Sequence, residues 1–423
     1  MGRRLAQRHS GRSTTEAMQG STSIPRSRGS IPEAPSWMSS DRESVLLSNS
    51  PVKNFTYSQI PTSSTTGISP NSPLSIDRIC SAALQPTENR NEGHTMLYVD
   101  SLLCTPLEKE RLEHRPALEE IAAGGVGCVT VTVGFWEDAT ESMDQIVRWQ
   151  HMAEDNSDLV EIAYTADDIE RIAQSGRCAI LLGFQNVAFL QGRLGYVELF
   201  ARMGTRVGQL TYNIQSDIGG SCYEPHDSGL SRYGKYVVRE MNRCGMVVDL
   251  SHVGNTTTID AIRHSAEPVA ITHSNPAELA PHPRNKPSEV LDALKDNGGV
   301  IGLSVYRNIV GEYTTAERWS ELVAWTVDRI GIDHVGIGTD FDQTGGKAYL
   351  EWMRQGRWAR EVQYGAGSKG NAGPQPRLGW FDDPSQFPNA ETCLRDRGFV
   401  DAEVAKIMGG NWLEFYRRTF KKL

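Results

Sequence analysis

Two short apolar runs rich in β-branched residues each end in a histidine. The first runs from Met246 to His252 and the second from Pro268 to His273. About twenty residues separate the two histidines, which is the length of one β-α-β unit. Parallel strands joined by such a crossover end at the same edge of their sheet. The pattern therefore predicts that both histidines emerge side by side from neighbouring strands.

Two imidazoles presented together are typical ligands of a metal ion such as zinc. The alternative is that each histidine ends its strand by hydrogen bonding to the backbone. Because His252 and His273 occupy equivalent positions on consecutive strands, we favour the metal-binding interpretation.

Strand-like runs recur eight times, and helix-like segments separate most of them. This alternation indicates an α/β fold with a parallel sheet, and eight repeats over about 250 residues predict a (β/α)₈ TIM-type barrel. An open doubly wound sheet is the alternative, but no G-x-G-x-x-G follows the first run. The predicted strands are Leu97–Leu103, Cys128–Phe135, Cys178–Phe184, Arg206–Tyr212, Met246–Ser251, Val269–Thr272, Val300–Val305 and His334–Thr339.

The segment after the eighth strand is longer than barrel closure requires, so we expect residues 352–370 to form an excursion over the barrel or into a partner. A final helix is predicted from Asp401 to about Arg418, broken near Gly409. The other predicted helices are Ala117–Ala123, Ser142–Asp155, Tyr196–Met203, Tyr233–Arg243, Thr256–His264, Ser288–Asn297 and Thr315–Ile330.

Residues 1–95 differ from the rest, because they are rich in Ser, Thr, Pro, Asn and Arg and show no sustained periodicity. Such a stretch buries too little apolar surface to offset its ordering entropy, which predicts a disordered extension. Its arginines also resemble an organellar transit peptide. A third interpretation is that translation starts at Met96. We therefore expect a tail over 1–95 and one barrel domain over 96–423.

The net charge of −9 argues against nucleic acid as a partner. Seven scattered cysteines without a C-x-x-C pair favour a reducing compartment, and we expect a cytoplasmic protein, with an organelle as the alternative. No run reaches the ~18 apolar residues that a membrane span requires.

Barrel enzymes carry their working residues where the strands end. Those positions here combine imidazoles with carboxylates, amides and a guanidinium, the set that a metal-assisted hydrolase needs for metal binding, proton transfer and carboxylate recognition. Taken singly, each also has a structural explanation, such as a helix cap or a surface charge. The candidates are Cys104, Glu137, Gln185, Tyr212, His252, His273, Arg284 and Asp340.

Four strings in this order resemble the renal-type membrane dipeptidases, zinc-dependent barrels of the amidohydrolase superfamily. The resemblance extends from about Met96 to the C-terminus, and this chain is a divergent case of it. The strings are Asp249-Leu-Ser-His252-Val, Thr272-His273-Ser-Asn, Pro283-Arg284-Asn285 and Gly336-Ile-Gly-Thr-Asp340-Phe-Asp.

The resemblance implies a role for each matching residue. His252 and His273 would bind one zinc, Arg284 would grip the terminal carboxylate of a dipeptide, and Asp340 would be the catalytic acid/base. It also implies a homodimer, and the Trp-rich excursion at Trp352–Trp358 and Trp380 offers aromatic anchors for its interface.

Departures from the family pattern concern the second metal. Leu102 and Cys104 replace the His-x-Asp pair after strand one, Gln185 replaces a bridging glutamate, and Tyr212 replaces a histidine. A neutral amide bridges two cations poorly, so we expect at most one zinc, held by His252, His273 and Gln185. Cys104 or Glu137 would be a further ligand. Tyr212 can still donate a hydrogen bond to a developing oxyanion.

Three functions remain open. The first is a metal-dependent hydrolase that cleaves a dipeptide or a related small amide carrying a free carboxylate. The second is lyase or decarboxylase chemistry on a small carboxylic acid, and the third is a catalytically silent binding protein. Fold alone does not separate them, whereas metal content together with turnover does.

Overall fold

The computed structural model describes residues 96–105, 114–343, 347–357, 360, 365–366 and 376–421. The predicted tail over 1–95 lies outside these residues, as do Trp358 and most of 361–375. No helix in the described part is both long and apolar enough to cross a membrane.

One parallel sheet organises the described residues. Its neighbours run in the order β10-β1-β2-β4-β5-β6-β7-β8-β9, and β3 pairs only with β4. The strands are β1 Tyr98–Cys104, β2 Val126–Gly134, β3 Val160–Ile162, β4 Cys178–Phe184, β5 Thr205–Gln209, β6 Val247–Asp249, β7 Ala270–Ser274, β8 Val300–Leu303, β9 Val335–Ile337 and β10 Phe341–Asp342.

The sheet closes into a ring through β9 and β10, which follow each other in the chain and pair with different strands. β9 pairs with β8, and three residues later β10 pairs with β1. Between β9 and β10, the amide N–H of Gly338 donates a hydrogen bond to Leu303 O on β8, and that of Asp340 donates to Leu102 O on β1. Since β9 and β10 are consecutive, the strands form a ring, and the predicted TIM-type barrel is confirmed.

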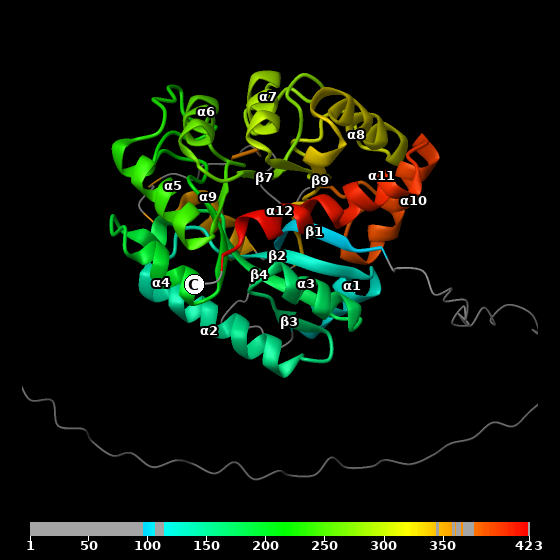
Figure 1. Cartoon of the computed structure of the whole chain (residues 1–423), viewed down its shortest axis with the longest axis horizontal. Helices are drawn as coiled ribbons and strands as arrows, with labels where there is room; N and C mark the ends of the chain where they lie inside the picture. The colour runs from blue at the N-terminus through cyan, green and yellow to red at the C-terminus, as the bar shows by residue number, and fades with distance from the viewer. Residues whose placement is uncertain are drawn as a thin grey trace, which may run out of the picture. The chain divides into compact units, whose positions relative to one another are not determined.

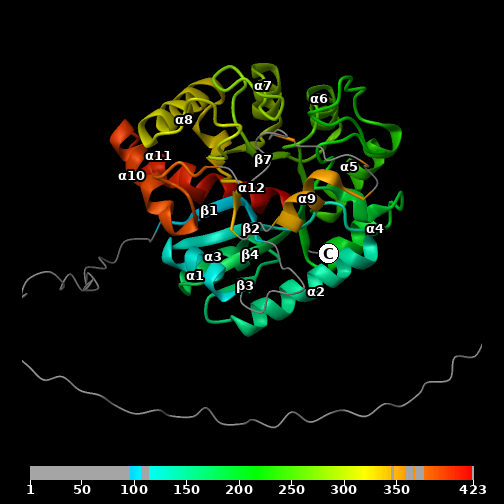
Figure 2. The same cartoon turned by 180° about the vertical axis from the view of Figure 1, so that it is seen from behind.

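Helices α1–α8 lie outside the strands, as Figures 1 and 2 show from opposite sides. The strands β3 and β10 and the helices α3, α9 and α10 were not predicted. β3 has three residues, too few for an apolar period. The helices are α1 Arg115–Ala123, α2 Ala139–Asp155, α3 Ala166–Gln174, α4 Tyr196–Arg202, α5 Arg232–Cys244, α6 Asn255–His264, α7 Ser288–Asn297, α8 Ala316–Ile330, α9 Lys347–Gln355, α10 Phe387–Arg397, α11 Asp401–Ala405 and α12 Asn411–Thr419.

Residues from α12 fill the N-terminal end of the barrel. Trp412, Phe415 and Tyr416 are buried against the first residues of the strands, and Trp412 Nε1 donates to Ile337 O. Figure 1 shows α12 in red beside β1 in blue. The predicted break of the last helix is confirmed, because a π-helical turn over Lys406–Gly410 separates α11 from α12.

The C-terminal end of the barrel is covered by α9. Trp136 Nε1, after β2, donates to Met353 O, and Trp352 Nε1 donates to Glu137 Oε1. α9 thus lies over the strand ends, which agrees with the first of the two expectations for the segment after strand eight.

Small residues let the strands meet inside the barrel. Ser101 Oγ, on β1, lies 2.5 Å from Thr272 O and 2.9 Å from Ile337 O across the interior, and its single proton can be donated to either carbonyl. A Cβ atom built on Gly338 would lie 1.8 Å from Thr272 O, and one on Gly302 would lie 2.1 Å from the same oxygen. Glycine is therefore required at both positions, because a backbone carbonyl cannot yield as a flexible side chain can.

We expect Gly338→Ala to lower the free energy of unfolding by about 3 kcal/mol or more, as overpacking against backbone does. Gly195→Ala is the matched control, since nothing lies within 4 Å of its Cβ position, and it should change stability by less than ~0.5 kcal/mol. Urea unfolding followed by tryptophan fluorescence measures both. Equal midpoints for the two variants would contradict this account of the interior.

Candidate active site

A cavity of about 420 Å³ opens at the C-terminal ends of the strands, beneath α9. This volume is typical of small-molecule sites. Six of the eight candidate residues line it, and the other two are Glu137 and His273. The Nε2 atom of His273 lies 3.1 Å from that of His252, which is part of the wall. The polar residues of the wall are Cys104, Gln185, Tyr212, Asn213, Tyr223, His252, Arg284, Tyr306, Arg307, Asp340, Asp342, Gln343, Tyr349, Arg354, Arg377 and Asp382.

The protonation of His252 follows from its neighbour Asn213. His252 Nδ1 lies 2.7 Å from Asn213 Oδ1, and an amide oxygen only accepts hydrogen bonds. Nδ1 therefore carries the proton, and Nε2 presents a lone pair. The ring of Tyr212 packs on this imidazole at 4.3 Å between centroids, which fixes its orientation.

His273 reaches the same state through a different partner. Its Nδ1 lies 2.8 Å from Thr272 Oγ1, which itself donates to Asp249 Oδ2 at 2.7 Å. Because the hydroxyl proton of Thr272 points to the carboxylate, the hydroxyl oxygen accepts from His273 Nδ1. The Nε2 atom of His273 is therefore also unprotonated.

The two Nε2 atoms lie 3.1 Å apart and face each other with lone pairs. Two lone pairs at this distance repel each other unless a cation lies beside both. Two nitrogens bound to one tetrahedral zinc at about 2.0–2.1 Å are roughly 3.3 Å apart. Burial, and then the charge of Arg284, lowers the pKa of both histidines well below the usual value, so both are neutral. The pair fits a metal ion.

Gln185 offers a third donor. Its Nε2 donates to Thr132 Oγ1 at 2.9 Å and to Cys104 Sγ at 3.2 Å, whereas its Oε1 is buried without a hydrogen-bond partner. An unpaired buried acceptor on the cavity wall suits a metal ligand. Burial raises the pKa of Cys104 well above the usual value, so this thiol stays protonated and does not offer a thiolate.

Glu137, the other open candidate, turns back on its own strand end. Glu137 Oε2 accepts from the amides of Phe135 and Trp136 at 2.6 and 3.0 Å, and Oε1 accepts from Trp352. Glu137 is not among the residues that line the cavity. It braces α9 instead of completing the histidine pair.

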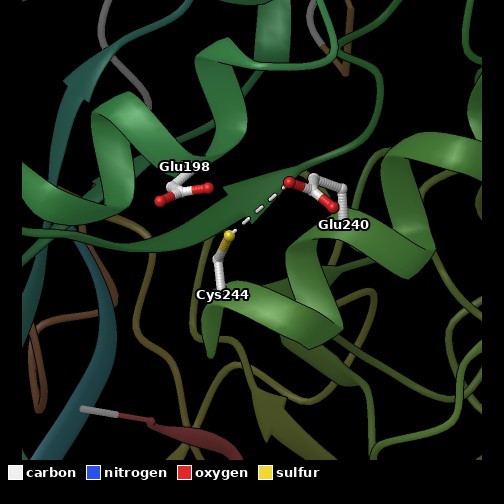
Figure 3. A group of neighbouring side chains, drawn as sticks. All are labelled: Glu198, Glu240 and Cys244. Atoms are coloured by element: carbon white, nitrogen blue, oxygen red, sulfur yellow. Dashed lines mark hydrogen bonds between the residues drawn. The ribbon is translucent and has the colours of Figure 1, made fainter. Parts of the chain in front are cut away.

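Among the described residues, one group of three acidic or thiol side chains lies close enough together to hold a metal, and it is elsewhere. Glu198 from α4 and Glu240 and Cys244 from α5 form it (Figure 3). Arg243 forms ion pairs with both glutamates, and Arg202 pairs with Glu198. The negative charge of this cluster is thus already balanced by arginines.

Arg284 lies in the loop after β7 and is buried. Its Nη1 donates to Ser251 O at 2.5 Å and its Nη2 to His273 O at 3.1 Å, which ties together the strand ends that carry the histidines. A guanidinium has five N–H groups, so three remain for a ligand in the cavity.

Asp340 has a left-handed backbone conformation, with φ of 60°. Burial raises the pKa of its carboxyl group to about 7, although the guanidinium of Arg284 opposes the shift. A group that titrates near neutral pH can both take up and release a proton under physiological conditions. Tyr212 differs, because burial raises the pKa of its phenol well above the usual value and keeps it a donor.

Sequence reasoning missed several residues of this site. Thr272 and Asn213 set the histidine tautomers, and the hydroxyl groups of Tyr223 and Tyr349 are buried without partners on the cavity wall. Asn213 and Thr272 were visible as neighbours of predicted site residues. Tyr223 follows β5 in an irregular loop that has no periodic signal.

Comparison with known proteins identifies relatives. A family model described as membrane dipeptidase, peptidase family M19, matches residues 99–354. Dipeptidase tcpJ from Claviceps purpurea is 35% identical over 285 residues, and dipeptidase verJ from Clonostachys rogersoniana is 38% identical over 282 residues. Each match covers 66% of this chain, but this chain spans only 60% and 65% of the two relatives.

Solved structures with a similar fold include an amidohydrolase and a metallo peptidase. An amidohydrolase from Pseudomonas aeruginosa has a TM-score of 0.70 and 32% identity, covering 77% of this chain and 97% of that one. A metallo peptidase from Rhodobacter sphaeroides, liganded with a phosphinate mimic of the dipeptide L-Ala-D-Ala, has a TM-score of 0.62. It is 19% identical and covers 77% of this chain and 99% of that one, which shows a shared fold. Since the family model spans more than half of the sequence, this chain belongs to the membrane dipeptidase family, peptidase family M19.

Proposed function

We propose that this chain is a metal-dependent hydrolase that cleaves a dipeptide or a related small amide carrying a free carboxylate. The observation that carries the proposal is the pair of unprotonated Nε2 atoms of His252 and His273, 3.1 Å apart beside the cavity. The relatives named dipeptidases support the reaction class.

The proposed metal is one zinc ion per chain, held by His252, His273 and the Oε1 atom of Gln185. When bound, zinc polarises a carbonyl group and acidifies water. A second cation is disfavoured, because Leu102 offers no ligand and Cys104 and Gln185 are neutral. Mutual repulsion between two cations needs anionic ligands to offset it.

The protein groups supply the remaining steps. The free N–H groups of Arg284 bind the substrate carboxylate, which orients the scissile amide. Asp340 takes up a proton as water attacks and delivers it to the leaving nitrogen. The hydroxyl group of Tyr212 donates a hydrogen bond to the oxyanion that develops on the carbonyl oxygen.

The two alternative functions would use the same cavity. Lyase or decarboxylase chemistry on a small carboxylic acid would use Arg284 in the same way, and a silent binding protein would need only the cavity. The pKa of Asp340 near 7 favours proton transfer, and therefore an enzyme, over silent binding.

Homodimer formation and a cytoplasmic location remain proposals. Two of the tryptophans that favoured an interface contact their own chain, since Trp352 Nε1 donates to Glu137 Oε1 and Trp380 Nε1 donates to Thr314 O, and Trp358 lies outside the described residues. The homodimer therefore rests on family resemblance. The six cysteines of the described part are all free, which supports a reducing compartment.

The purified protein should contain at most one zinc ion per chain by elemental analysis. His252→Ala and His273→Ala should each lose it, because each removes one of three ligands. His151→Ala, on the exposed face of α2, is the control and should keep it. A panel of dipeptides assayed on the same samples should show weak turnover that follows metal content. Two zinc ions with ordinary turnover would contradict the one-metal site, and turnover of another acid would favour the lyase alternative.

Arg284→Ala should lower kcat/KM for a dipeptide by roughly a hundredfold, because a charge-assisted two-point contact contributes about 1.5–3 kcal/mol. Arg284→Lys should lose less, since it keeps the charge and loses the paired geometry. An amidated substrate should show little further loss on the Arg284→Ala background. Additive losses would mean that Arg284 only ties Ser251 O to His273 O, and thermal melting of each variant monitors that structural contribution.

A further inference from the structure

Two buried aspartates occupy equivalent places in the barrel. Asp249 ends β6 and accepts from the amide of Ser251 at 3.1 Å. It also accepts from Thr272, on the neighbouring strand β7, through the amide at 3.0 Å and the hydroxyl at 2.7 Å. The residue after Thr272 is His273, so this carboxylate holds the backbone that carries a predicted metal ligand.

Asp100 repeats the arrangement on β1. It accepts from the amide of Leu102 at 3.2 Å, two residues along its own strand. It also accepts from Thr339, beyond β9, through the amide at 2.9 Å and the hydroxyl at 2.5 Å. The residue after Thr339 is Asp340. Both carboxylates are almost completely buried, with 0% of Asp100 and 1% of Asp249 exposed.

We propose that Asp100 is a positioning residue for Asp340, whose turn it fixes and whose surroundings it makes more negative. The proposal rests on the proposed function, in which Asp340 moves the proton. Asp100 does not line the cavity and acts only through Thr339 and through its charge.

Backbone strain explains why Asp340 needs such support. A non-glycine residue with φ near 60° costs about 1–3 kcal/mol and persists where its surroundings determine it. Several contacts fix this turn. The Asp100 carboxylate accepts from the amide and the hydroxyl of Thr339, and Ser304 Oγ donates to Thr339 O at 3.2 Å. The Asp340 amide donates to Leu102 O at 3.2 Å, and the Phe341 amide donates to Thr339 Oγ1 at 3.2 Å. The Asp100 carboxylate is the partner of both the Thr339 amide and the Thr339 hydroxyl, so its removal takes two hydrogen bonds from the residue that precedes Asp340.

The charges around Asp340 come from several elements. Burial raises the pKa of its carboxyl group most, and Arg284, in the loop after β7, lowers it. The carboxylates of Asp100, Asp342 and Asp249 raise it further. Burial raises the pKa of Asp100 itself to about 7, so Asp100 is fully charged only above that pH. Removing this charge should therefore lower the pKa of Asp340. The neutral titratable groups that face Asp340 are Cys104 on β1, Tyr212 and Tyr223 after β5, and Tyr306 after β8.

Asp100→Asn removes the charge and keeps the contacts with the amides of Leu102 and Thr339, because both donate to one oxygen, which Asn retains. The Asn NH2 group then faces the Thr339 hydroxyl and donates to it. ¹³C NMR of protein labelled at the aspartate carboxyl carbons follows Asp340 directly, and Asp340→Asn identifies its signal. We expect the Asp340 midpoint to fall by about one pH unit. The kcat value should fall about tenfold with KM changed less than twofold, since Arg284 is untouched.

Thr339→Val isolates the geometry, because it removes the hydroxyl contact and leaves the charge of Asp100. It should lower kcat about tenfold while the midpoint of Asp340 moves less than in Asp100→Asn. Asp249→Asn is the matched control, because Asp249 makes with Thr272 the same two contacts that Asp100 makes with Thr339. It should reduce zinc content and shift the Asp340 midpoint less, because Asp249 contributes least to that shift.

The proposal is overturned if Asp340 titrates identically in the unmodified protein and in folded Asp100→Asn, with kcat unchanged. If Asp100→Asn does not fold, Thr339→Val decides, and an unchanged kcat at an unchanged melting temperature overturns the proposal. The NMR titration needs no turnover. A protein that hydrolyses no dipeptide would thus refute the proposed function while the NMR result still decides the role of Asp100.

Discussion

The hydrogen bond from Thr272 to the buried carboxylate of Asp249 is the interaction on which the site depends. It uses the only proton of the Thr272 hydroxyl, so the oxygen is left to accept from His273 Nδ1. That acceptance leaves His273 Nε2 unprotonated, opposite the equally unprotonated Nε2 of His252. The Asp249 carboxylate does not line the cavity, yet through Thr272 it sets the tautomer of His273. The two unprotonated nitrogens that result favour a cation beside them.

The fold, and the gathering of most candidate site residues at one cavity, could be predicted from the sequence because both follow from strand periodicity. Apolar runs alternating with helices imply parallel strands, and parallel strands all end at one face of a barrel. Residues as distant in sequence as Gln185 and Asp340 were placed together by that rule alone. The rule fails for β3 and its following helix α3, where three strand residues are too few to show a period.

What could not be predicted depends on contacts between residues far apart in the chain. Asp100 and Thr339 are separated by 239 positions, and nothing in either local sequence indicates that Thr339 donates hydrogen bonds to the Asp100 carboxylate. The tautomers of the histidines likewise depend on Asn213 and Thr272, whose side-chain directions follow from the closed barrel. Local patterns identify which groups reach the cavity, whereas their protonation is a property of the assembled network.

Charge balance connects the missing family ligands to the proposed substrate. Arg284 lies beside the histidine pair, and the buried Lys286 behind it donates to Val253 O at 2.6 Å, with a pKa that burial lowers to about 7. A zinc ion held by two imidazoles and an amide would keep its full positive charge next to these groups. The substrate carboxylate would then supply the negative charge that Cys104 and Gln185 do not. In the proposed function, substrate and metal therefore stabilise each other in the cavity, and a single cation is enough only when an anionic ligand accompanies it.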